Sequence, residues 1–443
     1  MHEALPLFPA EFNGSIRIEA REERLTSDAG VLALRESLER LKMWSWLDEG
    51  LRDERTPELV THPFIELVRT SILLQAQGYR DLDDADALRM DAALRLAVSS
   101  RKGTSPLVVP ERPEGKPAPK NPKAPEHLAS QPTLSRLTAA LATADNRQVL
   151  REGLSVLAGR RLAAEQGRLP EELTVDIDSL PIEVEGKQPE ASYNGHYRAT
   201  IYHPLVATVA ETGDLIDVNL RRGNCHTAEG AMEFLEPLLE RVETHMCHKA
   251  SVRMDAGFPS EGLLAALEKR GTAYVARVRN NAVLDRMAMP LLKRPAGRRP
   301  KEPRTWCHEM SYRAESWSRE RRVVLVVLER EEDLFLHHFW LITNWTAAEK
   351  DAETLLQTYR KRGAAEGYMG ELMSVLAPAL SFRERGLAAK AKSALQAAGN
   401  LTPVEGQDTS VISMAQAIVD QTDSGVTVKV VSSSNSHVDG SGG

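Results

Sequence analysis

The spacing of apolar residues changes near residue 171, and this change constrains the fold more than any other feature. Before it, apolar side chains recur at the spacing of amphipathic helices. After it, they alternate with polar side chains, as in LTVDIDSL, where Leu173, Val175 and Ile177 share one face of a strand. Asp176 and Asp178 share the other face. We therefore predict a helical N-terminal region followed by a sheet.

The order of elements after residue 171 predicts a mixed sheet with helices on its faces. Three strands are followed by a helix, a strand, a second helix and a further strand. A turn at Thr212-Gly213-Asp214 is expected to join the second and third strands. Thr227 precedes the first long helix, and Gly271 is expected to end the second. Such an order is typical of α/β domains.

Residues 1–165 are expected to form a helical N-terminal region. Within it, residues 101–127 are rich in Pro and Lys and lack periodicity, which predicts a loop or linker. A helix is expected to begin near Pro132 and Thr133 with a polar first turn. That start resembles the N-terminus of the recognition helix in a helix-turn-helix. An ordinary capped helix of a helical bundle is the alternative.

The stretch 281–345 interrupts the alternation of strands and helices. It contains a basic, Pro-rich segment and then two strands, RRVVLVVLE and LFLHHFWLITN, which we expect to pair as a hairpin. We interpret 281–345 as a β-rich insertion in a core formed by 171–280 and 346–380. Residues 395–443 end in a Ser/Gly-rich stretch and are expected to be largely disordered.

The net charge of −7 mildly disfavours nucleic-acid binding, because phosphate contacts need clustered Lys and Arg. Such clusters nevertheless occur at 293–304, 319–322 and 359–362. Each is a candidate phosphate-binding patch, and a solvated loop is the alternative.

Cysteine usage and hydropathy indicate an intracellular protein. Cys225, Cys247 and Cys307 are too few and too scattered for a disulfide framework. No apolar run reaches membrane-spanning length, and the first residues lack the basic and apolar segments of a signal peptide. His245 and His248 flank Cys247, but no second ligand pair at zinc spacing accompanies them, so we interpret them as a chance cluster.

Three carboxylates lie where this fold would bring them together. Asp178 and Asp255 are placed at the ends of predicted strands, and Glu366 lies on the predicted helix YRKRGAAEGYMGELM. Carboxylate oxygens suit Mg²⁺, and two such ions about 3.5–4 Å apart cleave phosphodiesters. Asp176 is the alternative first ligand. The alternative roles are strand-end turns for the aspartates and an ordinary ion pair with Arg362 for Glu366.

The same helix carries further functional candidates. Tyr359, Arg362, Glu366 and Met373 fall on one helical face. An arginine in this position is a good bidentate partner for phosphate.

Together these motifs resemble the DDE transposases of bacterial insertion sequences, in the branch with a Y-x2-R-x3-E-x6-K signature helix. The resemblance covers about residues 12–380. It rests on LTVDIDSL, on YNGHYRATIYHPLVA with ETGDLIDVNLRRGN, on SVRMDAGF and on YRKRGAAEGYMGELM. LTSDAGVLALRESLERL and LASQPTLSRL also resemble that branch. The implied fold is α/β: a ribonuclease-H-like mixed sheet flanked by helices, with a β-rich insertion, preceded by a helical N-terminal DNA-binding region.

The resemblance also implies a function. Family members bind the terminal inverted repeats of their element, assemble a synaptic homodimer on double-stranded DNA, and cleave and transfer strands with Mg²⁺, for which Mn²⁺ substitutes. Matched onto this chain, Asp178, Asp255 and Glu366 are the catalytic ligands of two metal ions. Tyr359 and Arg362 would contact the DNA backbone. Such a protein works in the cytoplasm, at the nucleoid, without a membrane partner.

Two departures from the family pattern leave other functions open. Met373 stands where the signature helix has Lys, and the chain after about residue 385 does not continue as the family does. One alternative is a decayed, catalytically inactive remnant that still binds DNA. Another is a host nuclease of the same fold without strand transfer.

Overall fold

The chain divides into two units, residues 1–153 with 386–443, and residues 154–385. The computed structural model describes residues 8–9, 11–13, 17–18, 29–79, 82–100, 127–184, 188–297, 301–363, 367, 416–422 and 425–431. Glu366, Met373 and nearly all of the predicted 101–127 loop lie outside the described residues, as does most of the predicted 395–443 tail.

The first unit consists mainly of short helices. These are α1 (Gly30–Arg40), α2 (Met43–Gly50), the 3₁₀ turn η1 (Pro57–Leu59), α3 (Phe64–Ala76), α4 (Asp84–Ala87), α5 (Ala92–Val98), α6 (Gln131–Leu141) and the start of α7 (Ala144–Gln166). Two short pairs of strands accompany them: β1 (Phe8–Pro9) with β2 (Arg17–Ile18), and β14 (Gln416–Thr422) with β15 (Gly425–Val431). The predicted helix start is confirmed, because α6 begins at Gln131 with Pro132 in its first turn.

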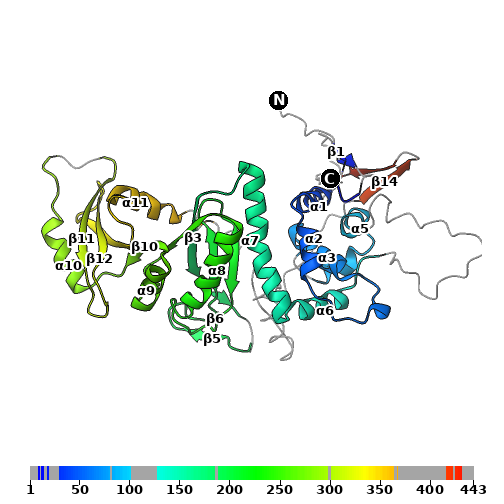
Figure 1. The fold of residues 1–443 in the computed structure, drawn as a ribbon, viewed down its shortest axis with the longest axis horizontal. Coiled ribbons are helices and arrows are strands. Elements are labelled where there is room, and N and C mark those ends of the chain that lie inside the picture. Colours follow the sequence, from blue (N-terminus) through cyan, green and yellow to red (C-terminus); the bar gives the residue numbers. More distant parts are fainter. Residues whose placement is uncertain are drawn as a thin grey trace, which may run out of the picture. The chain divides into compact units, whose positions relative to one another are not determined.

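An eight-stranded mixed sheet forms the centre of the second unit, as the sequence predicts (Figure 1). The strands are β3 (Glu172–Ser179), β7 (Leu205–Val209), β8 (Leu215–Asn219), β9 (Lys249–Met254), β10 (Ala273–Val278), β11 (Arg304–Tyr312), β12 (Arg321–Glu329) and β13 (His337–Thr343). Their order is β11-β12-β13-β10-β9-β3-β7-β8. β3, β9 and β10 are parallel, and all other neighbours are antiparallel. The predicted hairpin of β12 and β13 is confirmed, and it extends this same sheet.

Helices cover both faces of this sheet. They are α8 (Ala231–His245), α9 (Glu261–Arg270), α10 (Ala282–Ala288) with the 3₁₀ turn η2 (Met289–Leu291), and α11 (Ala352–Arg360). The last part of α7 packs with α8, α9 and α10 against one face, which includes Val175, Val252 and Trp340. α11 packs Leu355 and Leu356 against the other face. Successive side chains of a strand point to opposite faces of the sheet. The alternation along each strand therefore decides which side chains enter each of these two layers.

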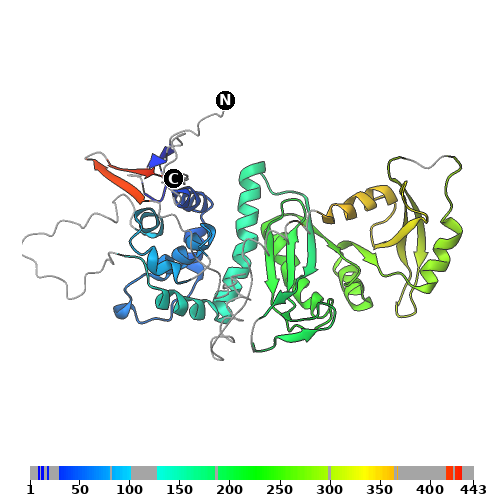
Figure 2. The same cartoon turned by 180° about the vertical axis from the view of Figure 1, so that it is seen from behind.

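A small second sheet lies between β3 and β7 in the chain. It contains β4 (Ile182–Glu183), β5 (Ser192–Asn194) and β6 (Ala199–Tyr202) in the order β4-β6-β5. The stretch ATIYHPLVATV, expected from its pattern to be the single strand before the turn at Thr212-Gly213-Asp214, is divided between the two sheets. The chain leaves the small sheet after Tyr202 and enters the main sheet at Leu205, because Pro204 has no N–H to donate to a ladder. Figure 2 shows the small sheet from behind, at one end of the main sheet.

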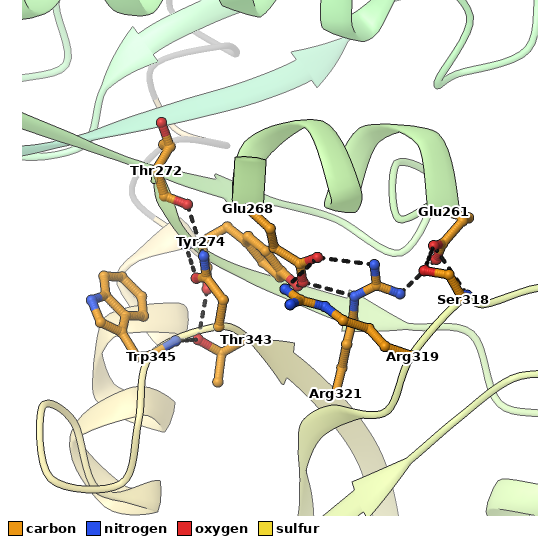
Figure 3. Close-up of polar contacts among 10 residues, drawn as sticks. Glu261, Glu268, Thr272, Tyr274, Ser318, Arg319, Arg321, Thr343 and Trp345 are labelled. Atoms are coloured by element: carbon orange, nitrogen blue, oxygen red, sulfur yellow. Dashed lines mark hydrogen bonds and ion pairs between the residues drawn. The ribbon is translucent and has the colours of Figure 1, made fainter. Parts of the chain in front are cut away.

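Within the candidate phosphate-binding patch at 319–322, Arg319 and Arg321 form an ion-pair network with carboxylates of α9 (Figure 3). Arg321 is buried and donates to Glu261 at 2.6 Å and to Glu268 at 2.8 Å. Arg319 pairs with Glu268 at 2.6 Å. Carboxylates of α9 therefore neutralise Arg319 and Arg321. Arg319 itself lies in an exposed loop before β12.

All three cysteines are free thiols, as predicted. Cys247 is buried, and its thiol donates to the backbone oxygen of Lys249 at 3.3 Å. Burial raises the pKa of Cys247 to about 11, so the thiol stays protonated and packs as an apolar group. Within the described ranges, no helix has both the length and the apolarity needed to cross a membrane.

The Arg321 network predicts a pH-dependent contribution to stability. The hydrogen bond from Arg321, followed by that from Ser318, lowers the pKa of Glu261 to about 2. A carboxyl with a lowered folded-state pKa stabilises the fold above its unfolded pKa, and this stability is lost as the pH falls through the folded value. We expect Glu261→Gln to lower the free energy of unfolding at pH 7 by about 1–3 kcal/mol. The difference from the parent should shrink as pH falls from 4.5 towards 2.

Urea unfolding of the full chain at pH 7, 4 and 3, followed by tryptophan fluorescence, measures this difference. Glu320→Gln is the matched control, because Glu320 is exposed and makes no ion pair with a described residue. A difference between Glu261→Gln and the parent that is independent of pH would contradict the assignment.

Candidate active site

Asp178 and Asp255 lie side by side at the carboxyl ends of two neighbouring strands. β3 and β9 are parallel, and their register pairs Asp176 with Arg253 and Ile177 with Met254. Asp178 and Asp255 directly follow the last of these pairs along the two chains. Neighbouring strands are about 4.8 Å apart, so two carboxylates on adjacent strands can bind the same metal ion. The structure thus brings together the first two predicted metal ligands.

Asp178 remains accessible and has an arginine beside it. Its side chain is 23% exposed. Arg362 donates from Nη2 to Oδ2 of Asp178 at 2.5 Å, and the N–H of Ser179 donates to Oδ1 at 2.8 Å. Arg362 therefore reaches the strand end from the residues that follow α11.

A tight local turn holds Asp255. The N–H of Gly257 donates to Oδ1 of Asp255 at 2.7 Å. A Cβ at position 257 would lie 2.9 Å from Cγ2 of Thr227 and 3.0 Å from Oδ1 of Asp255, so this close approach requires glycine. Oδ2 of Asp255 has no hydrogen-bond partner among the described residues. The turn thus fixes one carboxylate oxygen and leaves the other available for a cation.

Asp176, the alternative first ligand, is held in a buried ion pair. Arg253 donates from Nε and Nη2 to its two oxygens, both at 2.6 Å, and the two side chains are 1% and 3% exposed. Burial raises the pKa of Asp176, although Arg253 opposes this effect. Both oxygens of Asp176 are therefore engaged by a buried arginine, whereas Asp178 is partly exposed at the strand end.

Arg253 also binds α11, the helix that carries the signature residue Tyr359. Its Nη1 donates to the backbone oxygen of Thr358 at 2.6 Å. One guanidinium thus connects β3, β9 and α11. Arg253 was not predicted from the sequence as a residue of the site. The available signal was a charged side chain inside ASVRM, an otherwise uncharged stretch of a central strand, since a buried arginine needs an acidic partner.

Of the remaining residues of the signature helix, the structure describes Tyr359 but not Glu366 or Met373. The ring of Tyr359 lies 6.3 Å from that of Phe339, measured between centroids, and packs on the core beneath α11. A DNA contact by Tyr359 stays a prediction. Glu366 and Met373 lie outside the described residues.

Tyr197 is a second residue that the sequence analysis missed. It lies in the turn between β5 and β6. Burial raises its pKa, and the negative charges of Asp178 and Asp255 raise it further. Its phenol therefore lies within the electrostatic field of both carboxylates. The local signal was the exposed aromatic and basic turn NGHYR.

Comparison with known proteins assigns the chain to a family. It belongs to the family described as transposase DDE domain group 1, whose sequence model matches residues 8–378. No curated protein matches its sequence. Among solved structures it is similar to a piggyBac transposase in a cryo-EM synaptic complex with hairpin DNA. The identity is 12%, the match covers 82% of this chain and 72% of that chain, and the TM-score is 0.36.

The site predicts stability losses of different size for its two neighbouring aspartates. Asp176→Asn leaves the Arg253 charge buried without a counter-charge, and we expect a loss of about 3–5 kcal/mol in the free energy of unfolding. Asp178→Asn removes a partly exposed pair, and we expect a loss of at most about 1 kcal/mol. Urea unfolding of the full chain at pH 7 measures both changes.

A double variant tests the cause of the larger loss. Asp176→Leu combined with Arg253→Met removes both charges together and should recover most of the stability. Equal losses for Asp176→Asn and Asp178→Asn would contradict the different roles assigned to them.

Proposed function

We propose that this protein is a DNA transposase that cleaves the ends of an insertion sequence and transfers them to target DNA. The observation that carries the proposal is the placement of Asp178 and Asp255 at adjacent strand ends, beside Arg362, in a chain of the transposase DDE family. The part of the sheet ordered β8-β7-β3-β9-β10, with α8 and α9 between its strands in the chain, supports a ribonuclease-H-like core.

The proposed metal ligands are Asp178, Asp255 and Glu366. Their carboxylate oxygens suit Mg²⁺, with Mn²⁺ as a substitute, and Oδ2 of Asp255 is available. When bound, two such ions lower the pKa of a water molecule and stabilise the leaving oxygen. The accessibility of Asp178 and the ion pair of Asp176 favour Asp178 as the first ligand.

The side chains of this protein position the reacting DNA. Arg362 orients the Asp178 carboxylate. Guanidinium groups bind phosphate oxygens in a bidentate manner, and we assign such a contact with the DNA to Arg362. We also assign to Tyr359 a contact with the DNA backbone. In the first step a water oxygen bonds to phosphorus, the P–O3′ bond breaks and the 3′ oxygen takes up a proton. In the second step that 3′-OH attacks a target phosphodiester and displaces its 3′ oxygen.

We assign DNA-end recognition to residues 1–165. That region would bind the terminal inverted repeats, and two copies would meet on double-stranded DNA in a synaptic homodimer. Residues 171–280 and 346–380 would form the catalytic core, with 281–345 as its insertion. The protein would act in the cytoplasm, at the nucleoid.

A decayed transposase is the second candidate function. Met373 in place of the signature Lys removes one cationic phosphate contact, and the chain departs from the family pattern after about residue 385. Such a remnant would bind the element ends without cleaving them. A host nuclease of the same fold would cleave DNA without strand transfer, and its gene would have no flanking inverted repeats.

Cleavage of a labelled duplex that carries the gene's own flanking repeat tests the proposal. We expect the full chain with Mg²⁺ to nick at the repeat boundary. Asp255→Ala and Glu366→Gln should each lower the rate by about 100-fold or more, the scale of losing one group that stabilises the transition state.

Glu315→Gln is the control, because Glu315 is an exposed carboxylate of the same unit without a described partner. Nicking by Asp255→Ala at the parent rate would rule out the assignment of Asp255. Binding without nicking by the parent would favour the decayed transposase.

A further inference from the structure

The hairpin of β5 and β6 displays aromatic and basic side chains on its surface. Tyr193 on β5 is 64% exposed, and Tyr197 in the turn is 37% exposed. Arg198, also in the turn, is exposed and makes no ion pair with any described residue. Exposed aromatic rings beside a free cation are the combination that binds single-stranded nucleic acid.

The backbone of this turn is strained at the arginine. Arg198 has φ +56°, in the left-handed region that glycine and asparagine occupy most easily. Its N–H donates to the backbone oxygen of Asn194 at 2.8 Å, which closes the turn. An arginine at such a position costs stability, and strain of this kind concentrates at functional sites.

The hairpin is rigidly attached to the chain beside it. Asn194 donates from Nδ2 to the backbone oxygen of Gly223 at 2.8 Å. A Cβ on Gly223 would lie 1.9 Å from the backbone oxygen of Ile201, so only glycine permits this packing. Tyr202 is buried and donates to the backbone oxygen of Pro189 at 2.5 Å. The exposed tip is therefore presented on a preorganised support.

The same support leads directly to Asp255. Buried Arg221 donates to the backbone oxygens of His203 at 2.8 Å and Thr227 at 3.0 Å. Thr227 in turn lies against Gly257, whose N–H holds Asp255. The hairpin and the carboxylates thus belong to one continuous set of contacts, at the end of the main sheet where Figure 1 shows β5 and β6.

The ring of Tyr197 is itself positioned by aromatic neighbours. It makes edge-on contacts with His196 at 4.8 Å and with His203 at 5.7 Å, measured between ring centroids. The raised pKa of its phenol, caused by burial and then by Asp178 and Asp255, agrees with a location at the carboxylates.

We propose that the β5–β6 hairpin is a nucleobase-binding platform: Tyr197 stacks on an unpaired base next to the cleaved phosphodiester, and Arg198 contacts a neighbouring phosphate. This inference rests on the proposed function, because that function places a DNA strand across Asp178 and Asp255. Stacking on a tyrosine ring is tolerant of base identity, so the platform would hold the strand end without reading its sequence.

Base stacking can be measured without cleavage. The probe is a duplex of the flanking repeat with a short unpaired end at the boundary, carrying 2-aminopurine in the unpaired segment. In EDTA, binding to the full chain should quench the 2-aminopurine fluorescence. Tyr197→Ala should abolish the quenching and weaken binding by about 5–150-fold, the range for losing one stacked base. Tyr197→Phe should retain both, because it keeps the ring.

Arg198→Asn tests the phosphate contact separately. Asparagine tolerates the left-handed backbone, so thermal stability should be kept or raised. Binding should weaken, and the slope of log K against log salt should fall by about 0.7–0.9, the value for one lost phosphate contact. Arg330→Asn is the control, since Arg330 is another exposed arginine of the same unit without a described partner.

Several outcomes would overturn the platform. Unchanged quenching and affinity in Tyr197→Ala would show that the tip does not bind DNA and would favour a protein partner for the hairpin. Equal losses in the Phe and Ala variants would assign the effect to the hydroxyl rather than to stacking. Failure of the parent to nick DNA in Mg²⁺ contradicts only the catalytic proposal, because the binding assay contains no metal.

Discussion

The ion pair between Arg253 and Asp176 is the interaction on which the second unit depends. A buried guanidinium without a counter-charge is unstable, so Arg253 fixes β3 against β9 in one register. Its Nη1 donates to the backbone oxygen of Thr358 and holds α11 over the same strands. This register places Asp178 beside Asp255, and the position of α11 lets the following residues reach Asp178. The ion pair thus organises the candidate site without being part of it.

The distribution of polar side chains in the sheet follows from this arrangement. Strands β12 and β13 bury apolar residues on both faces. The central strands β3 and β9 bury apolar residues under α8 and polar ones on the opposite face, where Ser251 and Thr174 also meet at 3.3 Å. Arg321 has a comparable role farther along the sheet, where it fixes β12 to α9. Two buried arginines therefore set the positions of helices that apolar packing alone would leave free to slide.

Three segments distant in sequence meet at the proposed site. The strand ends supply carboxylates, the chain after α11 supplies Arg362, and the small sheet supplies Tyr197. Under the proposed function these groups would divide the work: cation binding by the aspartates, phosphate positioning by the arginine and base stacking by the tyrosine. The small sheet matters because a rigid hairpin holds a flexible strand end at lower entropic cost than a mobile loop.

The sequence alone determined the local elements, because helix caps and strand alternation depend on nearby residues. Gly271 ends α9 in the left-handed conformation, and β3 and β9 end where the pattern predicts. Tertiary structure alone decided which aspartate is paired and which is accessible. That choice depends on Arg253, 77 positions from Asp176, and on Arg362, 184 positions from Asp178. Local periodicity places both aspartates on the same strand face and does not distinguish them. They differ only because different charged residues pack against each of them in the folded protein.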